Sequence, residues 1–218
     1  MTSSLPASNV GHSEEAAVLY GAQPARRRDA QRNRAAILLA ACEVMTSQQP
    51  VVGMPEIARR AGIGQATLYR HFPDRVALAG AVIGHLIDGL ESCVAAGREQ
   101  PATFRGALDA ILRVQVTMRP LVQLSRRLDS ATRGRYLRRV ITVLADPLRR
   151  AQEDGRVRAD LVPADLVLLF GMVEGVVESA PTAGEAVIAA GRSIDLALDG
   201  VFRPVSTPSE ASLRIGKL

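Results

Sequence analysis

The chain has 218 residues, of which 47% are hydrophobic and 22% charged, so it can bury a core and is neither fibrous nor disordered in composition. Its net charge of +5 at pH 7 suits a polyanionic partner. Cys42 and Cys93 form no metal-binding spacing and no disulfide framework, which favours two buried thiols in a reducing compartment. The apolar stretch at residues 166–177 is too short to span a membrane, and no signal peptide is visible, so we expect a cytoplasmic protein.

The predicted elements are helices almost throughout, because Ala and Leu are abundant and strand-forming alternation is scarce. We expect a disordered arm over residues 1–23 and a flexible tail over residues 204–218. Ile37, Ala41 and Val44 repeat at helical spacing and predict a first helix over residues 28–47. The following helices are predicted at residues 55–61, 65–72, 75–97, 103–118, 120–129, 134–154, 163–179 and 183–202, which gives an all-α chain of about nine helices.

The second and third predicted helices are short and are joined by a glycine turn. Gly62 ends the first of the pair, Pro73 stops the second, and Asp74 is placed to cap the long helix that follows. Ile57 and Leu68 are spaced to form a small core with the first helix. This pattern predicts a helix-turn-helix domain over residues 24–75.

The exposed side of the helix at residues 65–72 carries many polar groups within about two turns. In a major groove, Gln65 can pair with adenine, and the methyl groups of Ala66 and Thr67 can contact the thymine methyl group. Nine Arg stand against four acidic residues over residues 24–75, so the net positive charge of the chain is concentrated in this region. The predicted DNA-binding residues are Gln65, Ala66, Thr67, Tyr69, Arg70, His71, Arg75, Arg28 and Arg32.

The run AGIGQATLYRHFPDRVAL, at residues 61–78, resembles the signature of TetR-type transcriptional regulators, and the resemblance extends over about residues 30–80. It implies a dimeric DNA-binding regulator, usually a repressor, in which Thr67, Tyr69, His71 and Arg75 hold phosphates. The chain departs from the family pattern at the start of the second helix, where Gly53 replaces the common Thr cap and Pro55 a polar or basic residue. Glycine is an acceptable cap, so the fold should survive with fewer phosphate contacts.

Residues 76–203 predict a larger helical domain for effector binding and dimerisation. The helix at residues 163–179 is apolar on nearly every face, and Gly171 and Gly175 would let a second helix approach closely. We expect this helix and the last one to form a four-helix interface between two chains, with an ordinary monomer core as the alternative. Glu174 is expected to pair with Arg192 or Ser193, or else to contact a cationic ligand. The predicted dimer-interface residues are Gly171, Gly175, Val187, Ile194 and Leu198.

An effector pocket is expected among the fourth to eighth helices, and its apolar candidates suit an apolar or weakly polar ligand. For each candidate, a place in the ordinary core is the alternative. The candidate lining residues are His85, Phe104, Ile111, Val114, Gln115, Met118, Leu121 and Phe170, with Ile87, Leu90, Leu108, Leu124 and Leu144 as further apolar candidates and Gln123 as a further polar one.

Two other classes of function compete with this interpretation. The chain lacks the HExxH, P-loop and GxSxG motifs, and the glycine pair at residues 62–64 follows a helix rather than a strand, so we expect no enzyme, cofactor or metal site. The second alternative is a DNA-binding regulator or architectural protein without a small-molecule effector, or an activator. Stabilisation by an apolar metabolite in a thermal-shift screen would argue for the effector.

Overall fold

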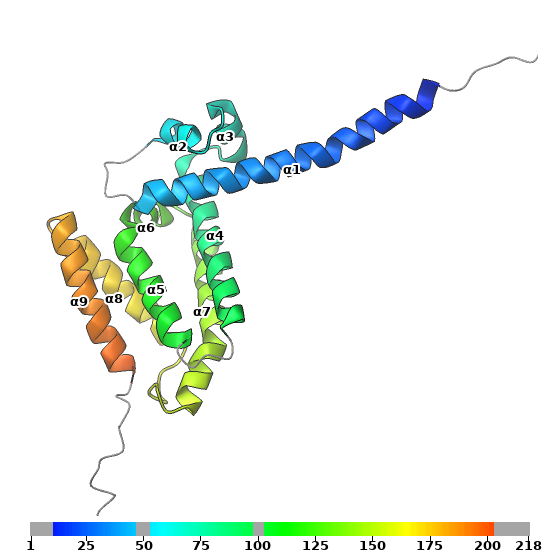
Figure 1. The fold of residues 1–218 in the computed structure, drawn as a ribbon. Helices are drawn as coiled ribbons and strands as arrows, with labels where there is room; N and C mark the ends of the chain where they lie inside the picture. The colour runs from blue at the N-terminus through cyan, green and yellow to red at the C-terminus, as the bar shows by residue number, and fades with distance from the viewer. Residues whose placement is uncertain (1–10, 47–52, 98–102, 203–218) are drawn as a thin grey trace, which may run out of the picture.

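The computed structural model describes residues 11–46, 53–97 and 103–202 (Figure 1). Within these ranges the chain is all-α, as predicted, with an isolated bridge between Val157 and Phe202 as its only strand-like pairing. The helices are α1 (Gly11–Thr46), α2 (Met54–Arg60), α3 (Gln65–His71), α4 (Arg75–Ala96), α5 (Thr103–Thr117), α6 (Arg119–Ser125), α7 (Ser130–Glu153), α8 (Asp165–Ser179) and α9 (Ala183–Val201).

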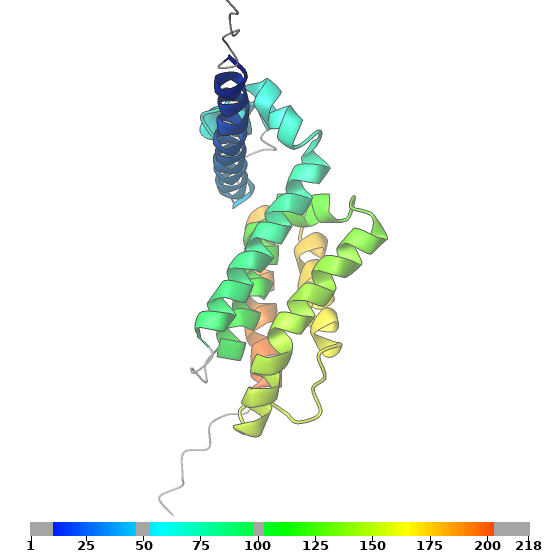
Figure 2. The same cartoon turned by 90° about the vertical axis from the view of Figure 1, so that its right-hand side faces the viewer.

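Helices α1 to α3 form one end of the molecule, and α4 runs from this end into a bundle with α5 to α9 (Figures 1 and 2). Two hydrophobic cores follow from this arrangement. One surrounds Ile37 and Leu68 in the N-terminal helices, and the other surrounds Leu108 and Ile194 in the bundle. Helix α4 belongs to both, because Leu78 lies in the first core and Val94 in the second. A displacement of α4 in the bundle would therefore also change the packing of α4 against the N-terminal helices.

Side-chain caps fix where several helices begin. The Asp74 carboxylate accepts a hydrogen bond from the Ala77 amide at 2.7 Å and caps α4, as predicted. Asp129 caps α7 in the same way, through the Thr132 amide at 2.8 Å. The sequence pattern predicted a start at about Gly134. The Asp129 cap instead begins α7 at Ser130.

Helix α1 is longer than predicted, since it begins at Gly11 and not near Arg28. The predicted disordered arm at residues 1–23 thus overlaps the helix, while residues 1–10 and the predicted tail at 204–218 lie outside the described residues. The apolar stripe that predicts the helix starts only at Ile37. Good helix formers such as Ala16 and Ala17 continue the helix upstream without an apolar stripe.

Among the described helices, α4 alone has the length and hydropathy of a membrane span. Helix α8, which contains the apolar stretch at residues 166–177, has only 15 residues. Helix α4 packs against α1, α5, α6 and α7, and its apolar side chains enter both hydrophobic cores.

Gly62 is required by the turn between α2 and α3, where its φ is +67°. An L-residue in this left-handed conformation costs about 1–2 kcal/mol. We expect Gly62→Ala to lower the free energy of unfolding by that amount in chemical denaturation. Gly89→Ala is the control, because Gly89 lies inside α4 and no atom lies within 4 Å of an added Cβ there. This control should raise stability by about 0.5–1 kcal/mol, and equal effects of the two substitutions would contradict the strained turn.

Candidate nucleic-acid interface

The α2–α3 pair is held by a short turn and a shared core. The Ile63 amide donates to the Ala58 carbonyl at 3.0 Å, which closes the turn after α2. Ala58 and Leu68 are buried against α1, so the two short helices have one fixed orientation. Gly53 occupies the cap position of α2 without a side-chain hydrogen bond, as its lack of a side chain dictates. The geometry is that of a helix-turn-helix unit.

Helix α3 presents a polar face to solvent on the side opposite Leu68. Gln65, Ala66 and Arg70 are exposed, and Tyr69 has 45% of its surface exposed although it is a large aromatic residue. Thr67 and His71 are half-buried at the edges of this face. The structure therefore brings the six predicted α3 residues onto one short helix whose only buried residue is Leu68.

The predicted basic residues around α3 differ in their availability. Arg28 and Arg32 of α1 are exposed, and Arg32 lies 3.8 Å from Asp29. Arg75 is half-buried, and its Nε is buried without a hydrogen-bond partner among the described residues. Sequence reasoning did not foresee that Arg34 stacks on the Phe72 ring, with its guanidinium carbon 4.9 Å from the ring centroid. Arg34 therefore supports the position of α3 directly.

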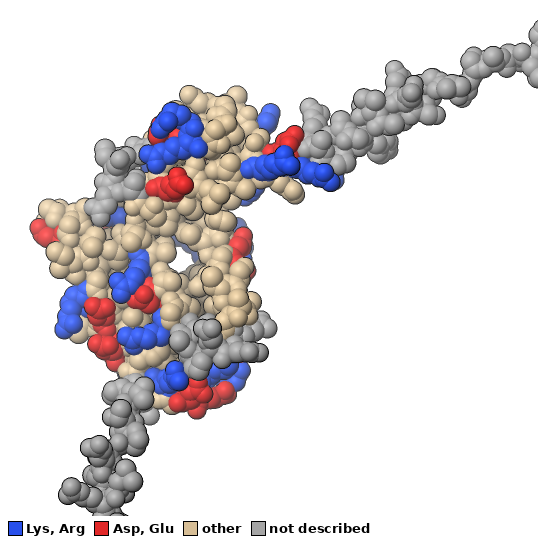
Figure 3. Space-filling view, viewed as in Figure 1, with Lys and Arg blue, Asp and Glu red and all other residues tan. Residues whose placement is uncertain are grey.

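Part of the basic charge in this domain is already neutralised. Arg59 and Arg60 both donate to the Glu56 carboxylate, at 2.6 and 2.9 Å. These hydrogen bonds lower the pKa of Glu56 to about 2. Figure 3 shows basic side chains over α1 and α2, with acidic side chains beside both. The positive charge counted from the sequence is consequently less available to a polyanion than the count suggests.

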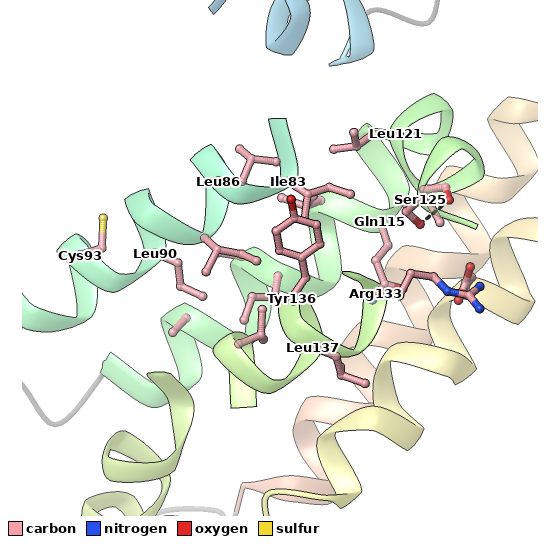
Figure 4. A pocket seen from close by; sticks show the side chains of 18 of the residues that line it. Ile83, Leu86, Leu90, Cys93, Gln115, Leu121, Ser125, Arg133, Tyr136 and Leu137 are labelled. Atoms are coloured by element: carbon pink, nitrogen blue, oxygen red, sulfur yellow. Dashed lines mark hydrogen bonds between the residues drawn. The ribbon is translucent and has the colours of Figure 1, made fainter. Parts of the chain in front are cut away.

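A second candidate site is a cavity of about 720 Å³ in the bundle, lined by side chains from α4 to α8 (Figure 4). Its volume lies within the range of small-molecule sites, about 300–1,000 Å³. Of the eight principal candidates, the structure places Ile111, Val114, Gln115 and Leu121 in its wall, together with Ile87 and Leu90 of the further candidates.

The remaining pocket candidates lie elsewhere. His85 is exposed outside the cavity, Phe104 and Met118 are buried in the two cores, and Phe170 packs against the bundle core. Gln123 is exposed, and its side chain does not line the cavity. Three of the further apolar candidates are also absent from the cavity wall: Leu108, Leu124 and Leu144. The ordinary-core alternative describes the buried residues of this set, whereas His85 and Gln123 lie on the surface, which neither the prediction nor its alternative anticipated.

The cavity also has polar residues that sequence reasoning missed. The Tyr136 hydroxyl donates to the Gly80 carbonyl at 2.7 Å and links α7 to α4. The Ser125 hydroxyl donates to the Val122 carbonyl at 2.6 Å within its own helix. Helix α7 is rich in Arg and has the pattern of a solvent-facing helix, which does not place Tyr136 in a cavity. A tyrosine in an otherwise Arg-rich stretch is the signal that the sequence offers.

Glu174 also lines the cavity, but its partner is not the predicted one. Its carboxylate accepts from the Arg126 Nε at 2.8 Å, and Arg126 additionally pairs with Glu178. Ser193 instead donates to the Ala189 carbonyl in its own helix. The prediction failed because the partner follows α6 in the sequence, 48 positions away, and periodicity along α8 and α9 cannot reveal it.

Comparison with known proteins identifies the N-terminal unit. Residues 37–82 match the family model described as bacterial regulatory proteins of the tetR family. This segment contains α2, α3 and the parts of α1 and α4 that pack on them. The N-terminal helix-turn-helix unit is therefore similar to that of tetR-family regulatory proteins.

Individual proteins are similar to the chain over different lengths. The chain is 29% identical over 92 residues to the HTH-type transcriptional repressor LfrR of Mycolicibacterium smegmatis, a match that spans 42% of this chain and about half, 48%, of LfrR. A TetR transcription regulatory protein of Mycobacterium vanbaalenii has a similar structure, with a TM-score of 0.60 and 27% identity over 81% of this chain and 99% of that one. For SCO0520 of Streptomyces coelicolor the TM-score is also 0.60, with 25% identity over 79% and 99% of the two chains.

The predicted dimer face is only partly exposed. Gly171, Gly175 and Val187 are exposed, as an interface requires. Ile194 and Leu198, however, are buried in the protomer's own core, so the prediction that they face a partner differs from the structure. Both lie on the side of α9 that packs on its own chain, since α9 contacts both α5 and α8. Periodicity placed these residues on one face but could not say which neighbour covers it.

The two cysteines differ in their exposure to solvent. Cys42 is half-buried, and burial raises the pKa of its thiol. Cys93 is exposed at the cavity wall, contrary to the expectation of two buried thiols. Its helix is apolar, but it lies near the end of α4, where most residues of the last turns are exposed.

Proposed function

We propose that the chain is a cytoplasmic, ligand-responsive transcriptional repressor that binds a palindromic operator as a dimer. One observation carries the proposal: α3 buries Leu68 and turns Gln65, Tyr69 and Arg70 outward on an otherwise well-packed domain. A helix of this size enters a major groove, where such side chains reach base edges and phosphates. Repression rather than activation of transcription is supported by the LfrR relative, which is an HTH-type transcriptional repressor.

The proposed dimer places an α3 helix from each chain on the same duplex. Its interface is formed by α8 and α9, where Leu168, Met172 and Ile188 are exposed by 65%, 58% and 76%. Together with Gly171 and Gly175, the two α8 residues form a stripe at helical spacing, which a symmetric partner would cover. Two-fold symmetry of the protein then requires an inverted repeat in the DNA.

The test is selection from a random duplex library with the full-length protein. We expect enrichment of an inverted repeat whose half-sites are separated by about 10 base pairs or a multiple, since α3 must enter successive grooves of one face. Enrichment of a sequence without two-fold symmetry would contradict the dimer on a palindrome. Failure to enrich any sequence would contradict sequence-specific binding itself.

Ligand response requires that the cavity be coupled to α3. The Tyr136–Gly80 hydrogen bond joins a cavity-lining side chain to α4. The first turn of α4 follows α3 after three residues, Phe72, Pro73 and Asp74. A ligand that displaces Tyr136 would shift α4 and with it the spacing of the two α3 helices, which changes operator affinity by population shift. Residues 24–75 and 76–203 are then the DNA-binding and effector-binding parts of the proposed mechanism.

Tyr136→Phe tests this coupling without altering the cavity shape. Loss of the hydroxyl should lower the free energy of unfolding by about 1 kcal/mol and change the operator dissociation constant several-fold, although Tyr136 lies far from α3 in sequence. Ser125→Ala is the control, because its hydrogen bond stays within one helical turn. Band-shift titration and thermal denaturation measure the two effects. Reduced stability with unchanged operator affinity would argue against this route.

A further inference from the structure

The polar groups in the cavity wall point to the class of molecule that it binds. We propose that the cavity takes a neutral, mainly aliphatic molecule with a hydrogen-bond donor, which donates to the side-chain carbonyl oxygen of Gln115. The inference rests on the proposed function, because it specifies the effector of the same regulator. Three features support it: the lining of the cavity, one unpartnered acceptor and the pairing of the nearby charges.

Most of the cavity wall is aliphatic. Helices α4 and α5 contribute Ile83, Leu86, Leu90, Ile111 and Val114. Tyr136 is the one aromatic residue among those that line the cavity (Figure 4). Its hydroxyl donates to the Gly80 carbonyl. A wall of this kind offers dispersion contacts to an alkyl group and little surface for stacking an aromatic ring.

Gln115 supplies the exception to this apolar lining. Its Oε1 is buried and accepts no hydrogen bond within the described part of the chain. A buried acceptor left unsatisfied is costly, and a donor on a bound molecule would remove that cost. The hydroxyl groups of Ser125 and Tyr136 already donate to backbone carbonyls, at 2.6 and 2.7 Å. Gln115 is therefore the group in this wall that gains most from a ligand donor.

The charges at the cavity favour a neutral ligand. The Glu174 carboxylate is engaged by Arg126, whose own pKa is raised by its hydrogen bonds to Glu178 and Glu174. Arg133 lines the cavity but is exposed to solvent. An ionised ligand group beside Gln115 would be desolvated opposite an uncharged amide, which is unfavourable.

A pair of isomeric probes separates the donor from the apolar body. 1-Octanol and 1-methoxyheptane have the same atoms, but only the alcohol has a hydrogen-bond donor. Isothermal titration of the full chain should show 1-octanol binding about tenfold more tightly, within the range expected from satisfying a buried acceptor. Equal affinities, or tighter binding of the ether, would overturn the assignment of Gln115 as the acceptor. Absence of binding by both probes would overturn the aliphatic ligand class.

Gln115→Met removes the acceptor and keeps an unbranched side chain of similar length. We expect the variant to bind the two probes within twofold of each other and to unfold at or above the wild-type temperature, since an unsatisfied buried group has been removed. Gln123→Met is the matched control, because Gln123 is exposed outside the cavity, and it should keep the tenfold preference. Retention of the preference in Gln115→Met would overturn the proposal.

Octanoate, which is ionised at pH 7.5, tests whether the cavity prefers a neutral ligand. It should bind more weakly than 1-octanol, and tighter binding would overturn the proposal in favour of an ion pair with Arg133. All these titrations are made without DNA. Failure of the probes would leave operator selection by the protein unaffected, and failure of operator selection would leave the probe preference unaffected, so the two results remain distinguishable.

Discussion

The double substitution Gln65→Ala/Tyr69→Ala should lower affinity for the selected operator by about 100-fold or more, because each side chain is lost from both half-sites and good base or phosphate contacts are worth about 1–3 kcal/mol each. The variant should remain folded. Alanine is the best helix former, and α3 is anchored by Leu68, which is unchanged. Fluorescence anisotropy with the operator duplex measures the loss, and circular dichroism measures the fold.

Gln123→Ala is the matched control for this experiment. Gln123 is exposed on α6, outside the helix-turn-helix unit, so its truncation should change operator affinity by less than twofold. Binding to DNA of unrelated sequence provides a second reference, because contacts to base edges should be lost preferentially from the operator complex. Wild-type operator affinity in a folded Gln65→Ala/Tyr69→Ala protein would show that α3 is not the element that reads the DNA.

The local signals in the sequence were sufficient for the order of the helices and for the exposed face of α3, but not for the first residues of α1 and α7. Gly62, Pro73 and Asp74 act on the residues next to them, so their effects on helix ends can be predicted without the tertiary structure. The same holds for Leu68, whose spacing relative to Ile57 allows only one side of α3 to enter the core. The exposed positions of Gln65, Ala66, Tyr69 and Arg70 then follow.

The cavity could not be predicted with the same accuracy, because it depends on how five helices fit together. Val114 and Met118 are one turn apart on or beside α5, yet the first lines the cavity and the second is buried in the N-terminal core. Hydrophobicity is the same for a residue that faces an empty space and for one that faces a neighbour. The contacts of Tyr136 with Gly80 and of Arg126 with Glu174 join residues about 50 positions apart, for which the sequence has no periodic signal.

Gly171→Glu should convert the proposed dimer into a monomer. Gly171 lies on the exposed stripe of α8, between Leu168 and Met172, and nothing within 4 Å would obstruct a Cβ there. The protomer can therefore accept the longer side chain. Two-fold symmetry would bring both carboxylates into an apolar contact, where desolvation and like charge should weaken association by about 100-fold or more.

Gly89→Glu provides the control for this substitution, because Gly89 is likewise an exposed glycine inside a helix with no atom within 4 Å of an added Cβ. Sedimentation equilibrium should give twice the chain mass of 23.2 kDa for the wild type and for Gly89→Glu, but a single chain mass for Gly171→Glu. The monomer should also bind the operator much more weakly although its α3 is intact, since it contacts one half-site at a time. A Gly171→Glu dimer of undiminished stability would exclude α8 from the interface, and any operator dimer would then have to use another surface.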